Sequence, residues 1–166
     1  MSARYAWILL PLAPLFGCAH SGTRVESAQG FDFARYQHIG VTAFTDRRGE
    51  GTRIAEGVDS GLRRIGRGGA DMKAIAEIVK GNRPDPDFGW GIEALETIRS
   101  KASADVILFG SMAPDWKAAT VTMIDTETGQ QVLRAWVKPA GKRHRAFLGA
   151  DEVVQETLRV FDTLGQ

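Results

Sequence analysis

The sequence predicts one α/β (α+β) domain, built on a mixed sheet of about five strands with a C-terminal strand meander and with helices packed on the sheet. Two observations support this prediction. In the first half of the domain, apolar stripes with helical spacing alternate with short strand-like runs. In the second half, three strand-like runs follow one another before a last helical stripe. The chain has 166 residues, which is enough for one domain with its own core.

The domain is expected to begin with a strand that is followed by a helix. Residues 37–44 (QHIGVTAF) hold three large apolar side chains between polar neighbours and predict the first strand, with the aromatic residues of 31–36 (FDFARY) packed at its edge. Residues 52–65 place apolar side chains at spacings of four, four and three. This spacing predicts an amphipathic helix with Thr52 as its N-cap and Gly66 as its C-terminal stop.

The middle of the chain is expected to hold two further helices around a loop. Residues 70–72 are a candidate short strand, and residues 73–80 are expected to be helical because Ala and Glu favour helices. Residues 82–90 (NRPDPDFGW) combine prolines, aspartates and a glycine, which predicts a loop. Residues 92–102 again carry a helical apolar stripe.

The last part of the chain predicts the meander and a closing helix. Residues 104–111 (ADVILFGS) are the most apolar run of the domain and predict a central strand buried on both faces. Residues 118–124 and 131–137 favour strands, joined by a DTETG hairpin turn whose glycine is expected in the left-handed conformation. The closing helix is expected over residues 151–164, with one apolar face formed by Val154, Leu158, Phe161 and Leu164.

The N-terminal segment has the features of a secretory signal peptide. Arg4 supplies a positive charge, and residues 6–16 (AWILLPLAPLF) form an apolar run of signal-peptide length that is too short to span a membrane as a helix. The run ends in Leu-Phe-Gly-Cys at residues 15–18. An ordinary secretory signal with an incidental cysteine, or a buried N-terminal helix, are the alternatives.

This ending resembles the lipobox of bacterial lipoproteins, which has Leu, a variable residue, a small residue and then Cys. The sequence departs from it at Phe16, where the pattern prefers a small residue. The resemblance implies cleavage before Cys18 and a diacylglycerol on its sulfur, usually with a third acyl chain on the new amine. Two or more acyl chains anchor a protein stably. Ala19 stands where an Asp commonly retains such proteins in the inner membrane, which favours the outer membrane, facing the periplasm.

The expected organisation is a signal peptide over residues 1–17, a lipidated Cys18 with a flexible tether over residues 18–30, and one globular periplasmic domain over residues 31–166. The formal charge of +1 becomes 0 when Arg4 is removed, so nucleic acid is not an expected partner. Cys18 is the only cysteine, which excludes an intrachain disulfide and a cysteine metal cluster.

Three motifs of the domain carry a family resemblance. They are HIGVTAF at its start, ADVILFGSM after a helix, and VTMIDTETGQQV in the meander. With them the domain resembles the periplasmic lipoprotein domain of CsgG-like and LpoB-like proteins, and also the N-terminal domain of TolB. Ser103 replaces a Gly of the second motif, whereas Asp125, Thr128 and Gly129 match the third. The resemblance spans residues 36–164 and implies the fold, because its motifs are mostly structural.

The sequence predicts no catalytic residue, no cofactor and no metal site. Gly49 and Gly51 lie between a strand and a helix, where nucleotide-binding glycines would lie, but Ile54 occupies the third glycine position and no Lys-Ser/Thr pair follows. We therefore interpret them as the turn that starts the helix. The three histidines form no i, i+4 pair, and no serine lies in a Gly-x-Ser-x-Gly context.

A basic stretch near the C-terminus is the main candidate for a partner surface. Its five cations are accompanied by no acid, and they are Arg134, Lys138, Lys142, Arg143 and Arg145. They predict a surface for lipid headgroups, cell-wall polymer or an acidic protein, unless they are only a solvated strand edge and loop. The loop 82–90, which ends in Trp90, is a second candidate surface. Trp90, Trp116 and Trp136 could each anchor a partner, but core or edge packing is the more expected role of each.

These observations favour a membrane-anchored envelope lipoprotein that acts by protein–protein interaction in cell-envelope assembly or maintenance, as an LpoB-like regulator of cell-wall synthesis. An accessory subunit of a CsgG-like secretion apparatus is the alternative, and an enzyme is the third hypothesis. The expected partners are the membrane, through the lipid anchor, and an envelope protein or cell-wall polymer. A homo-oligomer is left open.

The lipid anchor is tested by Cys18→Ser. We expect the variant to be released from membranes or to accumulate as uncleaved precursor, because the acylated sulfur is the anchor. Cell fractionation with acyl-label incorporation measures this. Parent protein that incorporates no label would show that Cys18 is not lipidated.

Overall fold

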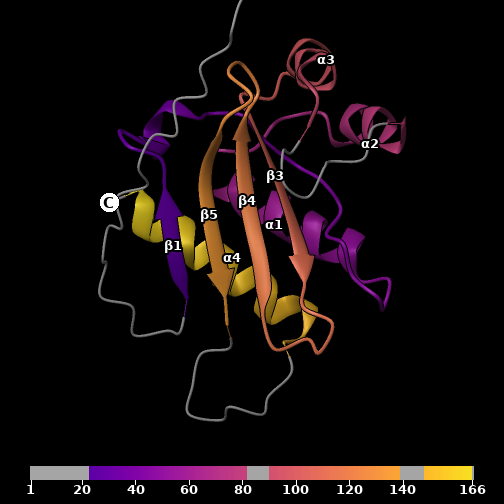
Figure 1. The fold of residues 1–166 in the computed structure, drawn as a ribbon, viewed down its shortest axis with the longest axis vertical. Helices are drawn as coiled ribbons and strands as arrows, with labels where there is room; N and C mark the ends of the chain where they lie inside the picture. The colour runs from indigo at the N-terminus through magenta and orange to yellow at the C-terminus, as the bar shows by residue number, and fades with distance from the viewer. Residues whose placement is uncertain (1–22, 82–89, 139–147, 166) are drawn as a thin grey trace, which may run out of the picture.

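The structure is a computed structural model that describes residues 23–81, 90–138 and 148–165. These residues form five strands, four α-helices and a short 3-10 helix, η1, that precedes β2, and Figure 1 shows how the elements are arranged. The strands are β1 (Arg24–Ser27), β2 (Ile39–Val41), β3 (Val106–Met112), β4 (Ala119–Asp125) and β5 (Gln131–Val137). The helices are η1 (Phe33–Arg35), α1 (Gly51–Arg64), α2 (Met72–Gly81), α3 (Ile92–Ala102) and α4 (Ala150–Leu164). No helix in these ranges is long and apolar enough to cross a membrane.

The five strands form one mixed sheet in the order β1-β5-β4-β3-β2. β2 pairs with β3 in parallel, and the other neighbours are antiparallel. β3, β4 and β5 form the meander that the sequence predicts, and Val106, Ile107 and Leu108 of β3 are fully buried. The predicted α+β class, with a mixed sheet of five strands, is therefore confirmed.

The helices cover the two faces of the sheet unequally. α1 and α4 lie side by side across one face, behind the strands in Figure 1, and pack with them into the larger core. α2 and α3 pack against the other face only at the end of the sheet that holds Ile107 and Ile124. The second face is therefore left without a helical cover over β1, β5 and the adjoining halves of β4 and β3, as far as the described residues show.

α1 begins at Gly51 because Asp46 satisfies the backbone N–H groups at the start of the helix. Its carboxylate accepts hydrogen bonds from three of them, including that of Gly51 at 2.7 Å. Burial opposes ionisation of Asp46, but these hydrogen bonds outweigh it and lower its pKa. The two glycines of the sequence GEG thus belong to a helix-start turn, as predicted, whereas Thr52 is not the N-cap: Glu50 occupies that position.

Two expectations for the helices are wrong in detail. Residues 70–72 form no strand, because the Asp71 carboxylate accepts hydrogen bonds from the N–H groups of Lys73 and Ala74 and so starts α2. The apolar face of α4 differs from the predicted one because the helix packs both against the sheet and against α1. The buried residues that belong to the larger core include Val153, Val160 and Phe161, whereas Val154 and Leu158 pack against the glycines of α1.

Part of the segment that was expected to be a flexible tether, residues 18–30, is a strand. Arg24–Ser27 form β1, the edge strand paired with β5. The sequence does not predict this strand because Val25 is its only large apolar residue, which is too little for a periodic signal. Arg24 lies six positions after Cys18 in the sequence, and a segment of this length spans at most about 20 Å.

A buried carboxylate holds the β4–β5 hairpin and ties it to the start of the domain. Asp125 is 3% exposed and accepts hydrogen bonds from the N–H groups of Glu127 and Thr128, and from the Tyr36 hydroxyl at 3.0 Å. Burial alone would raise the pKa of Asp125, but these hydrogen bonds lower it. Burial and the adjacent carboxylate raise the pKa of Tyr36 to about 12. Gly129 closes the turn with φ of +70°, as predicted.

Gly51→Ala tests the start of α1. A Cβ there would lie 1.8 Å from the carbonyl oxygen of Phe44, so the backbone must move, and we expect a loss of about 1–3 kcal/mol in the free energy of unfolding. Gly91→Ala is the control, because its Cβ would meet no atom within 4 Å and its effect should stay within about 0.5 kcal/mol. Urea midpoints at unchanged slope measure both. Equal midpoints would contradict the steric argument.

Asp125→Asn tests the hairpin contact and its pH dependence. We expect a loss of about 1.5–3 kcal/mol at pH 7, the usual contribution of hydrogen bonds to a charged group. Because the folded pKa lies below the unfolded one, this stabilisation is complete above the unfolded pKa of about 3.9 and is lost as the pH falls through the folded pKa. The difference between parent and variant, measured by urea unfolding at pH 7 and pH 3, should narrow at pH 3. If the difference in the free energy of unfolding between parent and variant is the same at pH 7 and pH 3, the Asp125 carboxylate does not stabilise the fold as we describe.

Candidate interaction surface

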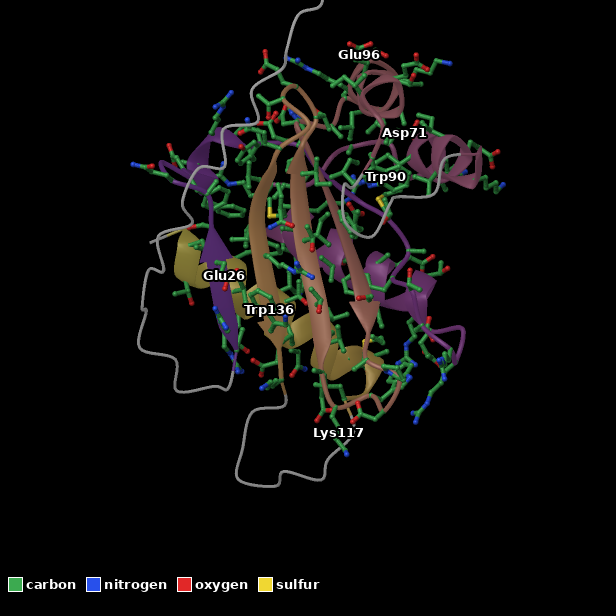
Figure 2. All side chains as sticks on the ribbon, in the orientation of Figure 1. Glu26, Asp71, Trp90, Glu96, Lys117 and Trp136 are labelled. Atoms are coloured by element: carbon green, nitrogen blue, oxygen red, sulfur yellow. The ribbon has the colours of Figure 1, made fainter. Side chains whose placement is uncertain are left out.

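On the uncovered part of the sheet, every second residue of the strands points away from α1 and α4, and most of these side chains are exposed or half-buried, whereas Thr122 is buried. In β5, Leu133, Ala135 and Val137 are buried in the core with α1 and α4. Side chains alternate between the two faces of a strand, so Arg134 and Trp136 point to the opposite, uncovered face. Figure 2 shows Trp136 on β5 next to Glu26 on β1 on this side of the sheet.

The strand register arranges the residues of this face in two rows that cross the sheet. The first row runs from β1 to β3 through Arg24, Trp136, Thr120 and Ser111. The second row runs through Glu26, Arg134, Thr122 and Phe109. We call these eight residues the open face. Its β1 and β5 side carries charges and an indole, whereas its β4 and β3 side carries mostly short hydroxyl side chains.

Two arginines contact the indole at the centre of the charged half. The guanidinium carbons of Arg24 and Arg134 each lie 5.2 Å from the ring centroid of Trp136. Arg24 also forms an ion pair with Glu26 at 2.5 Å. Among the described residues no carboxylate pairs with Arg134, although Glu26 is its cross-strand neighbour. The open face thus holds two cations and one acid, with the two cations placed on one aromatic ring.

The structure describes two of the five basic residues that the sequence grouped as a partner surface. Arg134 lies on the open face, and Lys138 is exposed directly after β5. The other three members of the basic stretch, Lys142, Arg143 and Arg145, lie outside the described residues, as does Cys18. The structure therefore does not describe the basic stretch as one patch. Of its members, Arg134 lies beside Trp136 on the open face.

Trp90, proposed as an exposed anchor, is buried. It is 5% exposed and packs in the smaller core with α2 and α3, near the labelled Asp71 in Figure 2. A hot-spot residue must be reachable by the partner, so Trp90 is not one in this conformation. Trp116 is also buried, at 3% exposure, and Trp136 is the tryptophan that reaches the surface of the described domain.

Sequence reasoning missed Arg24 and Glu26, which complete the open face. Both lie in the segment that was expected to be a tether, 110 residues before Arg134 in the case of Arg24. The alternation of Arg, Val and Glu at residues 24–26 is the signal that could have indicated a strand. It is too short to stand out without knowledge of its partner strand.

A second surface feature lies on the opposite side of the domain. α1 and α4 border a shallow open groove of about 840 Å³. Val154 and Leu158 reach into the positions left empty by Gly57 and Gly61, which lets the helices approach closely. Arg53 and Asp151 form an ion pair across the groove at 3.0 Å. Its basic and acidic side chains are balanced in number, so the groove does not select a charged ligand.

Four described residues have pKa values that their surroundings shift. Tyr36 has a raised pKa, and Asp46, Asp115 and Asp125 have lowered ones. General acids and bases work best with a pKa near the ambient pH, and each of these shifts moves a group further from neutrality. What the open face offers is binding chemistry, through guanidinium, indole and hydroxyl groups.

The fold has counterparts among solved structures. The PelC dodecamer from Paraburkholderia phytofirmans matches with a TM-score of 0.53 at 19% identity, over 86% of this chain and 96% of that one. A PelC dodecamer with a leucine-to-methionine substitution matches at 0.50 and 20% identity, over 84% and 95%. E. coli LpoB matches at 0.41 and 14% identity, over 61% and 56%. No protein-family model and no curated protein matches the sequence. The PelC structures therefore share the fold of this domain.

Proposed function

We propose that this protein is a lipid-anchored protein of the bacterial envelope that works by binding and not by catalysis, in envelope assembly or maintenance. The open face carries the proposal. A sheet that is covered by helices on one face and partly open on the other presents an extended, rigid surface, and this one displays the arginine and tryptophan side chains that are enriched in binding hot spots.

The sequence and the position of β1 support the location that we propose. A signal peptide that ends in a lipobox-like Leu-Phe-Gly-Cys would leave an acylated Cys18, and Ala19 after it favours the outer membrane, facing the periplasm. Because Arg24 already belongs to the sheet, the anchor would hold the edge of the open face within about 20 Å of the bilayer. The binding surface would then face partners at or near the membrane.

Two finer functions fit this proposal. The motifs that resemble LpoB-like domains favour a regulator of cell-wall synthesis. The fold shared with the PelC dodecamers favours a second candidate, a subunit of an oligomeric envelope apparatus, in which copies of this chain would contact one another. The two candidates differ in what the domain touches in the cell: a different protein in the first case, and also a copy of itself in the second.

Site-specific photo-crosslinking in cells tests the proposal and separates the candidates. A photoreactive residue at Ser111, exposed on the open face, should give specific adducts, whereas the same residue at Ser60, exposed on α1, is the matched control. Adducts with the mass of two chains would indicate self-assembly, and adducts with another envelope component would indicate a regulator. Adducts formed equally from both sites, or only from Ser60, would show that the open face is not the working surface.

A further inference from the structure

We propose that the open face binds an acidic polysaccharide chain, with a carboxylate at Arg134 and a sugar ring close to Trp136. This inference rests on the proposed function, since it takes the open face as the working surface, and it specifies the chemical class of the ligand. The ligand would lie across the strands, along the row from Arg24 to Ser111.

The first argument is that Arg134 is already positioned for an anion. A guanidinium in cation–π contact with an aromatic ring can still donate its N–H groups to a carboxylate, in the bidentate arrangement that suits both groups. Arg24 and Arg134 are both held at Trp136, each at 5.2 Å from the ring centroid. A long side chain that is already positioned loses less conformational entropy when it binds, which favours binding at this place over binding to isolated surface arginines.

The second argument is the charge that remains. Arg24 and Arg134 carry two positive charges and Glu26 carries one negative charge, which leaves one positive charge on the cluster. The Glu26 carboxylate is engaged by Arg24 and its side chain is only 22% exposed, so it is not positioned to serve Arg134 as well. Arg134 is exposed. A carboxylate from outside the chain would therefore complete the cluster at Arg134.

The third argument is the shape and chemistry of the row beyond Trp136. Thr120 and Ser111 are its next members, and both have short hydroxyl side chains that donate and accept hydrogen bonds. From Trp136 to Ser111 the row crosses two strand spacings of about 4.8 Å each, so the shelf beside the cationic cluster is about 10 Å long. This length accommodates a short run of linked sugar rings, whose hydroxyl groups suit such a shelf.

The same features distinguish a polysaccharide from an acidic protein. Protein interfaces have a core that is rich in large apolar side chains. On the open face the large apolar groups are Trp136 and the half-buried Phe109, and the accessible remainder consists of the charged side chains and the hydroxyl groups of Thr120 and Ser111, because Thr122 is buried. A carboxylated sugar chain combines the anion that Arg134 lacks with the hydroxyl groups that the shelf can bind. We therefore commit to the polysaccharide, and an acidic polypeptide becomes a control in the test.

The experiment measures binding of oligogalacturonate, a short chain of carboxylated sugars, to the full mature chain in detergent. Arg134→Gln and Trp136→Leu alter the open face. Arg64→Gln, an exposed arginine on α1, is the control with the same change in charge. Affinity is determined by titration calorimetry at low and physiological salt, and melting curves establish that each variant is folded. If Trp136→Leu does not fold, Arg134→Gln carries the test.

We expect the parent and Arg64→Gln to bind oligogalacturonate with equal affinity, and Arg134→Gln to bind on the order of tenfold more weakly, as expected for one charge-assisted contact. The fully methyl-esterified oligomer and poly-glutamate should both bind much more weakly, since the first lacks the charge and the second lacks the sugar rings. Equal loss in Arg134→Gln and Arg64→Gln, or poly-glutamate bound as tightly as oligogalacturonate, would overturn the inference.

The outcomes also separate this inference from the proposed function. Photo-adducts from Ser111 with no binding of oligogalacturonate would keep the open face as the working surface and refute the polysaccharide. Binding that depends on Arg134, without photo-adducts to any protein, would support the polysaccharide and refute the protein–protein form of the proposed function.

Discussion

The close packing of α1 against α4 is the contact on which the arrangement of the domain depends. Gly57 and Gly61 leave room for Val154 and Leu158, so the two helices lie near each other under one face of the sheet. Together they supply the main apolar layer, and β3, β4 and β5 direct alternate side chains into it. Once this face is covered, the other face needs only α2 and α3 at one end, and the open face is what remains.

Asp125 gives this layer a fixed relation to the start of the domain. A buried carboxylate is tolerated because it accepts hydrogen bonds from the turn that follows it and from Tyr36, 89 positions earlier in the chain. Tyr36 lies between β1 and β2 in the chain. Asp125 therefore shapes the β4–β5 hairpin and also fixes the segment that leads from β1, at one edge of the sheet, to β2 at the other edge. Burial acts to raise the pKa of Asp125 and the hydrogen bonds act to lower it, and the hydrogen bonds dominate.

The open face shows how a candidate binding surface can be divided between distant parts of a chain. Arg134 and Trp136 are two residues apart and come from the last strand, whereas Arg24 and Glu26 come from the first. Arg24 and Glu26 have no distinctive sequence environment, and Arg134 stands out in the sequence only as a member of a basic stretch. The antiparallel pairing of β1 and β5 places two guanidiniums at one indole, a combination that the number of basic residues in a stretch does not indicate.

The sequence by itself determined the elements with strong local signals: the helical spacing of α1 and α3, the apolar run of β3, and the turn at Asp125 and Gly129. These depend on residues that are close in sequence, so periodicity and turn chemistry are sufficient to predict them. The tertiary structure alone decided that residues 24–27 are a strand, that Trp90 is buried and that Trp136 is the tryptophan at the surface. The physical reason is that a short edge strand is stabilised by its partner strand, and the face on which a side chain lies depends on which helices cover that face, neither of which is encoded within a local window.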